Sequence, residues 1–404
     1  MTNMKQDIPP GPEPQEYQDR IRALFESAIA QRGDWDAVFI VDKVNQYYFT
    51  GTMQDGVFIL LRDGSYAYFV RRSIERARLE SRLENIYPMN SYGDIKSRLD
   101  KRIENVFLET EVITYGMLQR MKKHFDFSEI IPADRLISRL RSVKSTYELA
   151  VMEESGRQHQ YLLEAIVPGL LKEGMNEAEF TAQMYAEMVK LGYQGITRFA
   201  MFQTEIIGGQ FGFGENSLYP TSFDGPGGMK GMCPAAPIIG DRERLLNKGD
   251  LVFVDIGYGI NGYHTDRTQV YMFGAKPPEW LERIHGQCKQ IQKQTAGLLK
   301  PGGVPADIYR TVMDVVPPEF LPDFMGFSGR TVKFLGHGVG LQVDEYPAIA
   351  AGFTEPLVEN TTLAVEPKKG VKGFGMVGVE DTYVVTGGGG RCVTGGEKDI
   401  ISVY

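Results

Sequence analysis

Two aspartates interrupt an apolar hairpin pattern in the second half of this 404-residue chain. Segment 251–273 reads LVFVDIGYGINGYHTDRTQVYMF, in which two strand-like runs flank a Gly-Ile-Asn-Gly turn. If paired residue numbers sum to 521, Asp255 lies directly opposite Asp266, and a slip of two residues, with Asn261-Gly262 at the turn, keeps both on one face. Two such carboxylates repel each other and lose their hydration unless a cation lies between them. The pattern therefore predicts a cation site.

A second pair of carboxylates shows the same conflict between charge and an apolar strand. The runs TTLAVEPKKG (361–370) and VGVEDTYVVT (377–386) each contain one glutamate of this kind, Glu366 and Glu380. A charged residue in such a run is disfavoured unless it is paired or binds a metal. The two positions are centred on Gly373, which predicts a second hairpin with a longer loop and the glutamates on neighbouring strands.

One histidine stands out among the five in the chain. His337 lies in FLGHGVGLQVDEYP (334–347), between glycines that allow the backbone to approach closely. His264 is close to Asp266 but faces the other way once the hairpin loop bulges, so we expect it to support the site or contact substrate instead of binding metal. The remaining histidines fall in helical, polar surroundings and are predicted to be structural or solvated: His124, His159 and His285.

Together these side chains form a set of mainly hard ligands. Four carboxylates and one imidazole favour Mn²⁺, Co²⁺, Fe²⁺ or Zn²⁺ over a thiolate-type metal. Two such ions can share a bridging water, lower its pKa and polarise a carbonyl oxygen. The alternative is five unrelated polar residues satisfied by hydrogen bonds, which their common β-strand setting disfavours. The predicted metal ligands are Asp255, Asp266, His337, Glu366 and Glu380.

The chain is long enough for two domains. Residues 1–15 are polar and proline-rich, without the apolar region of a signal peptide, and are expected to form a flexible lead-in. Residues 16–135 alternate helical and β-rich runs, which predicts a small α/β domain. Residues 136–404 combine helical segments with strand-like runs, which predicts an α+β domain with a mostly antiparallel sheet.

Two helix starts in the larger domain carry a capping box, in which an N-cap side chain and an acidic residue three positions later bond each other's backbone. These pairs are Ser145 with Glu148 and Asn176 with Glu179. An apolar periodic run follows the first pair, so a long helix is predicted there.

Charge and cysteine content exclude several classes of protein. The net charge of −8 and the pI of about 5.4 argue against a general affinity for nucleic acid. The three cysteines are widely spaced and form no CxxC pair, which is typical of neither a zinc knuckle nor a disulfide framework. Scattered thiols and the lack of any apolar run of about 18 residues predict a cytoplasmic protein without a membrane segment.

The order and spacing of the five predicted ligands resemble those of the pita-bread metallopeptidases, a family that includes methionine aminopeptidase, aminopeptidase P, prolidase and creatinase. The segments RLRSVKSTYELAVMEESG, LNKGDLVFVDIG, GHGVGL and AVEPK followed by VGVEDT resemble motifs of the prolidase-type catalytic domain. The smaller N-terminal domain resembles the one that prolidase, aminopeptidase P and creatinase share. The resemblance covers nearly the whole chain.

This resemblance implies a dinuclear hydrolase that acts near the N-terminus of small peptides, often at Xaa-Pro bonds. A metal-bridging hydroxide would attack the scissile carbonyl, and Glu366 would bind metal and assist proton transfer. Members of the family are commonly dimers, so a homodimer is expected.

Two positions depart from the family pattern. The peptidases usually carry a Pro-His step before the first aspartate strand, where this chain has Pro237-Ile238, and His-Glu-x-Pro after the GHG motif, where it has Asp344-Glu345-Tyr346-Pro347. Both missing imidazoles would be expected to contact substrate, and loss of an oxyanion donor costs about 10²–10³ in rate. Asp344 is instead expected to attract a cationic group such as a free α-amine, although it could equally be a cap or turn residue.

Three functions follow from these observations. The leading one is an Xaa-Pro dipeptidase or aminopeptidase. The second is a hydrolase or lyase of a small nitrogen- or sulfur-containing metabolite on the same fold, which the two missing histidines favour. The third is a binding module without catalysis, which the complete ligand set disfavours because a scaffold does not need five desolvated ligands.

Overall fold

The computed structural model describes residues 9–201, 204–396 and 398–404. By its internal contacts the chain divides into two compact units, Pro10–Arg141 and Ser142–Tyr404. Helix α6, Asp134–Ser142, crosses the domain limit that we expected after residue 135. Most of the expected lead-in, residues 1–15, lies outside the described residues, and helix α1 already begins at Pro14.

The smaller unit contains a six-stranded mixed sheet in the order β4-β3-β2-β1-β5-β6. Its strands are β1 (Ala37–Ile40), β2 (Gly56–Leu61), β3 (Tyr66–Val70), β4 (Ile86–Pro88), β5 (Asn105–Leu108) and β6 (Glu129–Pro132). Its helices are α1 (Pro14–Gln31), α2 (Lys43–Thr50), α3 (Ile74–Glu80), α4 (Tyr92–Leu99), α5 (Tyr115–Met121) and α6. The alternation of helices and strands predicted for this part of the chain is confirmed.

Two helices of the larger unit, α7 and α9, begin where the two capping boxes predict. The Ser145 hydroxyl accepts from the Glu148 backbone N–H and the Glu148 carboxylate accepts from the Ser145 N–H, at 3.2 and 2.8 Å. Asn176 and Glu179 repeat this arrangement. The helices are α7 (Thr146–Tyr161), which a π-helical turn (Leu162–Ile166) joins to α8 (Val167–Leu170), then α9 (Glu177–Lys190), α10 (Glu279–Leu298) and α11 (Pro305–Met313).

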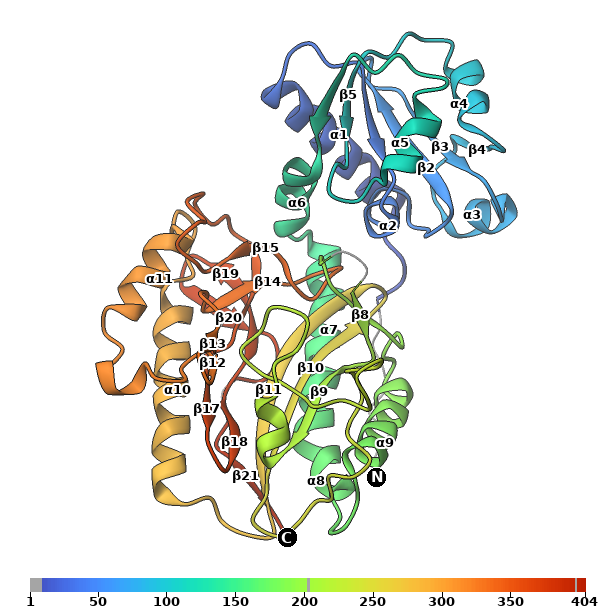
Figure 1. Ribbon diagram of the computed structural model, residues 1–404. Coiled ribbons are helices and arrows are strands. Elements are labelled where there is room, and N and C mark those ends of the chain that lie inside the picture. Colours follow the sequence, from blue (N-terminus) through green and yellow to red (C-terminus); the bar gives the residue numbers. More distant parts are fainter. Residues whose placement is uncertain (1–8, 202–203, 397) are drawn as a thin grey trace. The chain divides into compact units, whose positions relative to one another are not determined.

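Two main sheets form the centre of the larger unit. Helices α7 and α9 pack on the first sheet, and α10 packs on strands of the second sheet and on α11 (Figure 1). The first sheet has the order β21-β11-β10-β9, with β9 (Gly209–Phe213), β10 (Leu251–Ile260), β11 (Tyr263–Phe273) and β21 (Ile401–Val403). The second has the order β15-β14-β16-β19-β20, with β14 (Gly336–Gly338), β15 (Glu345–Ala348), β16 (Thr362–Val365), β19 (Asp381–Thr386) and β20 (Gly389–Cys392).

Three short two-stranded sheets complete this unit. They pair β7 (Thr197–Arg198) with β8 (Glu205–Ile206), β12 (Gly326–Phe327) with β13 (Arg330–Thr331), and β17 (Lys368–Val371) with β18 (Gly375–Gly378). Among the described residues, no helix is long and apolar enough to cross a membrane.

The register of the first hairpin differs from the simplest pairing. Asp266 is opposite Gly257, and Asp255 is opposite Thr268, so the direct Asp255–Asp266 pairing is wrong and the alternative with a two-residue slip is correct. The turn consists of Asn261-Gly262, whose φ angles of 48° and 92° are those of the tight turns that join twisted strands. Because the slip is an even number of residues, both aspartates keep the same face.

The second hairpin is centred on Gly373, as predicted. Val365 pairs with Asp381 and Lys368 pairs with Gly378, so Glu366 and Glu380 fall opposite each other between the two paired segments. Glu366 follows β16 directly and Glu380 precedes β19 directly. The backbone N–H of Thr268 donates to the Glu380 carbonyl at 3.3 Å, which joins this hairpin to the first one.

We expect Gly262→Ala to destabilise the larger unit. A left-handed conformation costs an L-residue about 1–2 kcal/mol, so the thermal unfolding midpoint should fall by a few degrees in calorimetry. Gly286→Ala is the matched control, because Gly286 lies in α10 and an added Cβ would meet nothing within 4 Å. An equal shift in both variants would contradict this explanation of the turn.

Candidate metal centre

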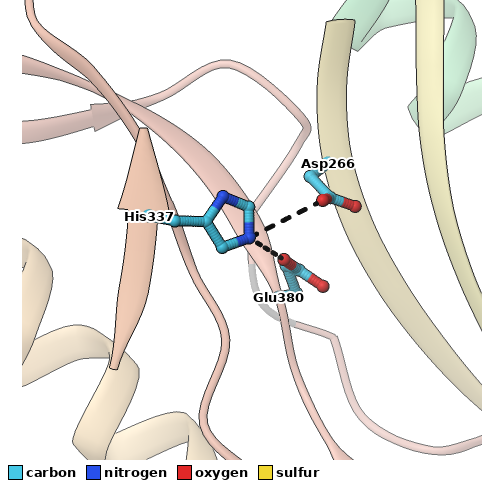
Figure 2. Close-up of side chains that lie close together, drawn as sticks. All are labelled: Asp266, His337 and Glu380. Carbon is cyan, nitrogen blue, oxygen red and sulfur yellow. Dashed lines mark ion pairs between the residues drawn. The ribbon is translucent and has the colours of Figure 1, made fainter. Parts of the chain in front are cut away.

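The five predicted ligands converge on one pocket of the larger unit, and all five line it. Figure 2 shows Asp266 of β11, His337 of β14 and Glu380, the residue before β19, pointing toward one another. The His337 Nε2 atom lies 3.9 Å from Asp266 Oδ2, 3.9 Å from Glu380 Oε1 and 3.2 Å from Glu366 Oε1. Residues separated by more than 100 positions in sequence therefore form one cluster.

Each of these side chains is positioned by a paired strand. Asp266 lies within β11, and its backbone N–H donates to the Thr382 hydroxyl at 2.8 Å. His337 is the central residue of β14, where it pairs with Ala364 of β16. Its glycine neighbour Gly336 is required, because a Cβ there would lie 2.0 Å from the Ala364 carbonyl oxygen. The close approach of β14 to β16 thus brings the imidazole over the carboxylates.

The structure adds a residue that our sequence reasoning missed. The Lys368 ammonium donates to Asp255 Oδ2 at 2.9 Å, to Glu366 Oε2 at 2.8 Å and to Glu380 Oε2 at 2.7 Å. Its side chain is 0% exposed. A signal was present in the sequence, because Lys368 lies two residues after Glu366 and side chains of a strand alternate between faces.

Burial and mutual charge shift the proton affinities of the cluster. Burial, then the neighbouring Asp255 charge, raises the pKa of Asp266 well above its ordinary value, and burial with the Asp266 charge does the same to Glu380. Burial would raise the pKa of Glu366 as well, but the charges and hydrogen bonds of Lys368 and His337 together outweigh burial and lower this pKa. The protein side chains alone therefore leave excess negative charge around Asp266 and Glu380.

The imidazole responds to the same excess charge. Burial alone would lower the pKa of His337, but its hydrogen bond with Glu366 and the charges of Glu366 and Asp266 raise this pKa to about 9. Protons on His337, Asp266 and Glu380 would therefore compete with a metal ion for the same atoms.

The arrangement of Asp266, His337 and Glu380 fits one divalent ion. One ligand atom from each lies within 4.8 Å of the others. Ligand bonds of about 2.0–2.2 Å allow two ligands of one ion to be separated by up to about 4.2 Å, and the 3.9 Å distances from His337 meet this limit. Among the described residues, no hydrogen-bond donor reaches Glu380 Oε1, although this atom is buried. A buried oxygen without a donor is suited to a cation.

His264, which we expected to support the site or contact substrate, does not line this pocket. The ring is fully buried, with Nδ1 3.0 Å from the Gly340 carbonyl and Nε2 3.0 Å from the Gln194 side chain. Burial lowers its pKa to about 4. Its hydrogen bonds connect β11 to the loop after β14, which is a structural role.

Two of the other histidines lie in helices and make structural contacts. His159 in α7 is buried against Thr265, with Nδ1 3.2 Å from the hydroxyl. His285 in α10 has Nε2 2.7 Å from the Lys398 carbonyl.

Asp344 lines the pocket, and Ile238, at the other departure from the family pattern, does not. The Asp344 carboxylate accepts from the Ala200 backbone N–H at 2.5 Å. Burial raises the pKa of Asp344 to about 6, although this hydrogen bond lowers it in part. Asp344 therefore orders the neighbouring loop and also presents a carboxyl group to the pocket.

Two aromatic side chains line the pocket beside the acidic residues. The rings of Phe199 and Phe223 lie 4.9 Å apart between centroids, and both line it. The pocket lining mixes these apolar rings with acidic side chains, which suits a small ligand that carries both apolar and polar groups.

Two family models match this sequence. Metallopeptidase family M24 matches residues 150–387, and the creatinase/prolidase N-terminal domain matches residues 20–143. These matches confirm the family resemblance and the fold class that we predicted from the sequence, an α+β pita-bread catalytic domain with a smaller α/β N-terminal domain.

Several known proteins are similar to this chain over nearly its whole length. An Xaa-Pro dipeptidase of Pyrococcus furiosus is 26% identical over 368 residues, which is 91% of this chain and 95% of that protein. A putative dipeptidase of Bacillus subtilis is 26% identical over 381 residues, 90% of this chain and 95% of that protein. The structure of a prolidase from Pyrococcus horikoshii superposes with a TM-score of 0.76 at 22% identity, over 95% of this chain and all of that one.

We expect Glu380→Gln to reduce affinity for a divalent metal by more than tenfold, since even changes outside the ligand shell cost about 10–100-fold. The amide keeps the volume of the side chain but removes its charge. Titration with Mn²⁺ followed by calorimetry measures the effect. Glu359→Gln is the control, because Glu359 is an exposed glutamate outside the pocket. Unchanged affinity in the Glu380 variant would remove it from the ligand set.

Proposed function

Because this chain belongs to metallopeptidase family M24, we propose that it is a metal-dependent hydrolase of short peptides, of the Xaa-Pro dipeptidase or aminopeptidase type. The observation that carries the proposal is the convergence of Asp266, His337 and Glu380 in a pocket, with ligand atoms close enough for one ion. The relatives named above, with their dipeptidase descriptions, support the substrate class.

The proposed roles follow from the position of each group. Asp266, His337 and Glu380 would hold a divalent ion, with Asp255 and Glu366 beside it on the pocket wall. A bound ion of this kind supplies Lewis acidity and lowers the pKa of a water molecule. Glu366 stays ionised because Lys368 and His337 together lower its pKa, so its carboxylate is proposed to accept a proton. These assignments make Glu366 the proposed catalytic residue.

Substrate would lie between the metal ligands and the two aromatic side chains that line the pocket. Phe199 and Phe223 offer apolar surface to a side chain or a proline ring. The carboxyl group of Asp344 is placed to attract a cationic group, and the excess carboxylates of the centre favour the same charge. We therefore propose that a free α-amine is bound at this end of the pocket.

A second candidate is a hydrolase or lyase of a small nitrogen- or sulfur-containing metabolite. The observation that favours it is that His337 is the sole imidazole among the described residues that line the pocket. Asp344 replaces one of the expected substrate imidazoles and Ile238 replaces the other. A peptide carbonyl would thus lack two donors that the family's peptidases usually provide. A binding module without catalysis remains the third alternative, and metal content separates it from the first two.

We also propose a homodimer in the cytoplasm, as the sequence led us to expect. Size-exclusion chromatography with light scattering measures the oligomeric state, and cell fractionation measures the location.

We expect metal-dependent release of alanine from Ala-Pro or from Ala-Pro-Xaa peptides. The purified protein is dialysed free of metal and reloaded with Mn²⁺, Co²⁺, Fe²⁺ or Zn²⁺, and free alanine is measured by amino-acid analysis. Cleavage of Ala-Pro alone indicates a dipeptidase, and cleavage of the longer peptides indicates an aminopeptidase. Ala-Ala is the control for the Xaa-Pro preference. Tight metal binding without cleavage of any peptide would favour the small-metabolite alternative.

We expect Asp344→Asn to reduce the preference for a free over an acetylated amine by roughly fivefold or more, the effect of about 1 kcal/mol at a partly screened ion pair. The preference of the unsubstituted protein should rise with pH through about 6, because Asp344 becomes charged there. The ratio of kcat/KM for the two substrates measures both effects. The same ratio in both proteins at every pH would show that Asp344 only orders the loop at Ala200.

A further inference from the structure

We infer that the Lys368 ammonium replaces one of the two metal ions expected for this centre, so that the protein binds a single divalent ion beside a built-in organic cation. The inference rests on the proposed function, because it concerns the metal of the same site. It changes the expected composition of the centre from two ions to one ion and one lysine.

The contacts of Lys368 use its full capacity for hydrogen bonding. An ammonium group has three N–H donors and no acceptor. Here three carboxylates accept from it, at distances of 2.7 to 2.9 Å, which are those of strong charge-assisted bonds. The three partners, Asp255, Glu366 and Glu380, are three of the five predicted metal ligands. A second ion would need the same oxygens and would lie within a few ångströms of a positive charge.

The backbone keeps the ammonium in this place. Lys368 pairs with Gly378 across β17 and β18, and its carbonyl accepts from the Met325 N–H at 2.7 Å. The strands approach so closely that a Cβ on Gly378 would lie 2.6 Å from the Lys368 Cα. With a side chain that is 0% exposed, the ammonium has no adjacent solvent into which it could withdraw when metal arrives.

Glu380 divides its two oxygens between the lysine and the remaining ligands. Its Oε2 accepts from Lys368 and from the Thr268 hydroxyl, at 2.7 and 2.9 Å. Its Oε1 lies on the side of His337, 3.9 Å from Nε2, and has no donor among the described residues. One carboxylate thus bridges the lysine and the position that suits a metal ion.

The net formal charge of the buried cluster also favours one divalent ion beside the lysine. The four carboxylates and one ammonium carry a formal charge of −3, and they are all nearly or fully buried. One divalent ion bound at Asp266, His337 and Glu380 reduces this to −1. A buried group of charges is costly unless it is close to neutral, so one ion removes most of the excess that Lys368 leaves.

The first test is the metal stoichiometry and the electron spin resonance of the unsubstituted protein loaded with Mn²⁺ and freed of excess by gel filtration. We expect one ion per chain and the six-line spectrum of an isolated Mn²⁺. Two ions about 3.5–4 Å apart, as in a two-metal site, would give two per chain and the broadened spectrum of a spin-coupled pair. That second result would overturn the inference.

The second test removes the charge but keeps the length of the side chain. We expect Lys368→Met to bind two Mn²⁺ per chain and to show the coupled spectrum, because the oxygens that the ammonium occupied become available. Lys369→Met is the matched control, since Lys369 is the next residue and donates to the Phe320 carbonyl at 2.9 Å, outside the cluster. It should keep one ion. If Lys368→Met does not fold, the unsubstituted protein still decides between one ion and two.

Peptide cleavage separates this inference from the proposed function. One ion per chain without cleavage of any peptide would keep the role of Lys368 and remove the peptidase. Two ions per chain with cleavage would keep the peptidase and overturn the role of Lys368. No bound ion at saturating Mn²⁺ would overturn both.

Discussion

The burial of four carboxylates in one place is the constraint on which the rest of the larger unit depends. Asp255, Asp266, Glu366 and Glu380 are each at least nine-tenths buried, and carboxylates that close cannot all remain charged without cations. The fold brings one cation of its own, Lys368, and an imidazole, His337, whose pKa the carboxylates raise to about 9. The net charge of the cluster is still negative after these two groups are counted, which is why the site is suited to a metal ion.

The two hairpins bring the four carboxylates together, and the short strand β14 adds His337 to them. The two aspartates of the first hairpin are offset by two residues across the paired strands, and the two glutamates of the second lie opposite each other, so each pair shares a face. The hairpins meet at Thr268 and Glu380, where a backbone hydrogen bond and the 2.9 Å bond from the Thr268 hydroxyl join them. Close packing at glycines allows the approach, since a side chain on Gly336 or Gly378 would collide with the neighbouring strand. Precision in the site thus comes from strand pairing, which loops could not provide.

The chemistry of the pocket differs from what family membership alone would suggest. The relatives support a peptidase, but this chain has Asp344 and Ile238 at the places of two expected imidazoles, and a lysine within reach of three predicted ligands. Both changes act on the same quantity, which is the balance of charge around the scissile bond. The preference for a cationic substrate group that we propose rests on the added carboxyl group of Asp344, whereas Lys368 adds a positive charge to the cluster.

The sequence by itself determined the family, the two capping boxes, the centre of the second hairpin and the residues that converge on the pocket, because each depends on local periodicity or spacing. Only the tertiary structure decided the register of the first hairpin and the burial of His264 against the Gly340 carbonyl. It also decided that the Lys368 ammonium lies among three carboxylates. A period of two assigns a side chain to a face of its strand, but it does not say what lies opposite that face. Asp255 is 113 positions from Lys368, and packing alone brings them together.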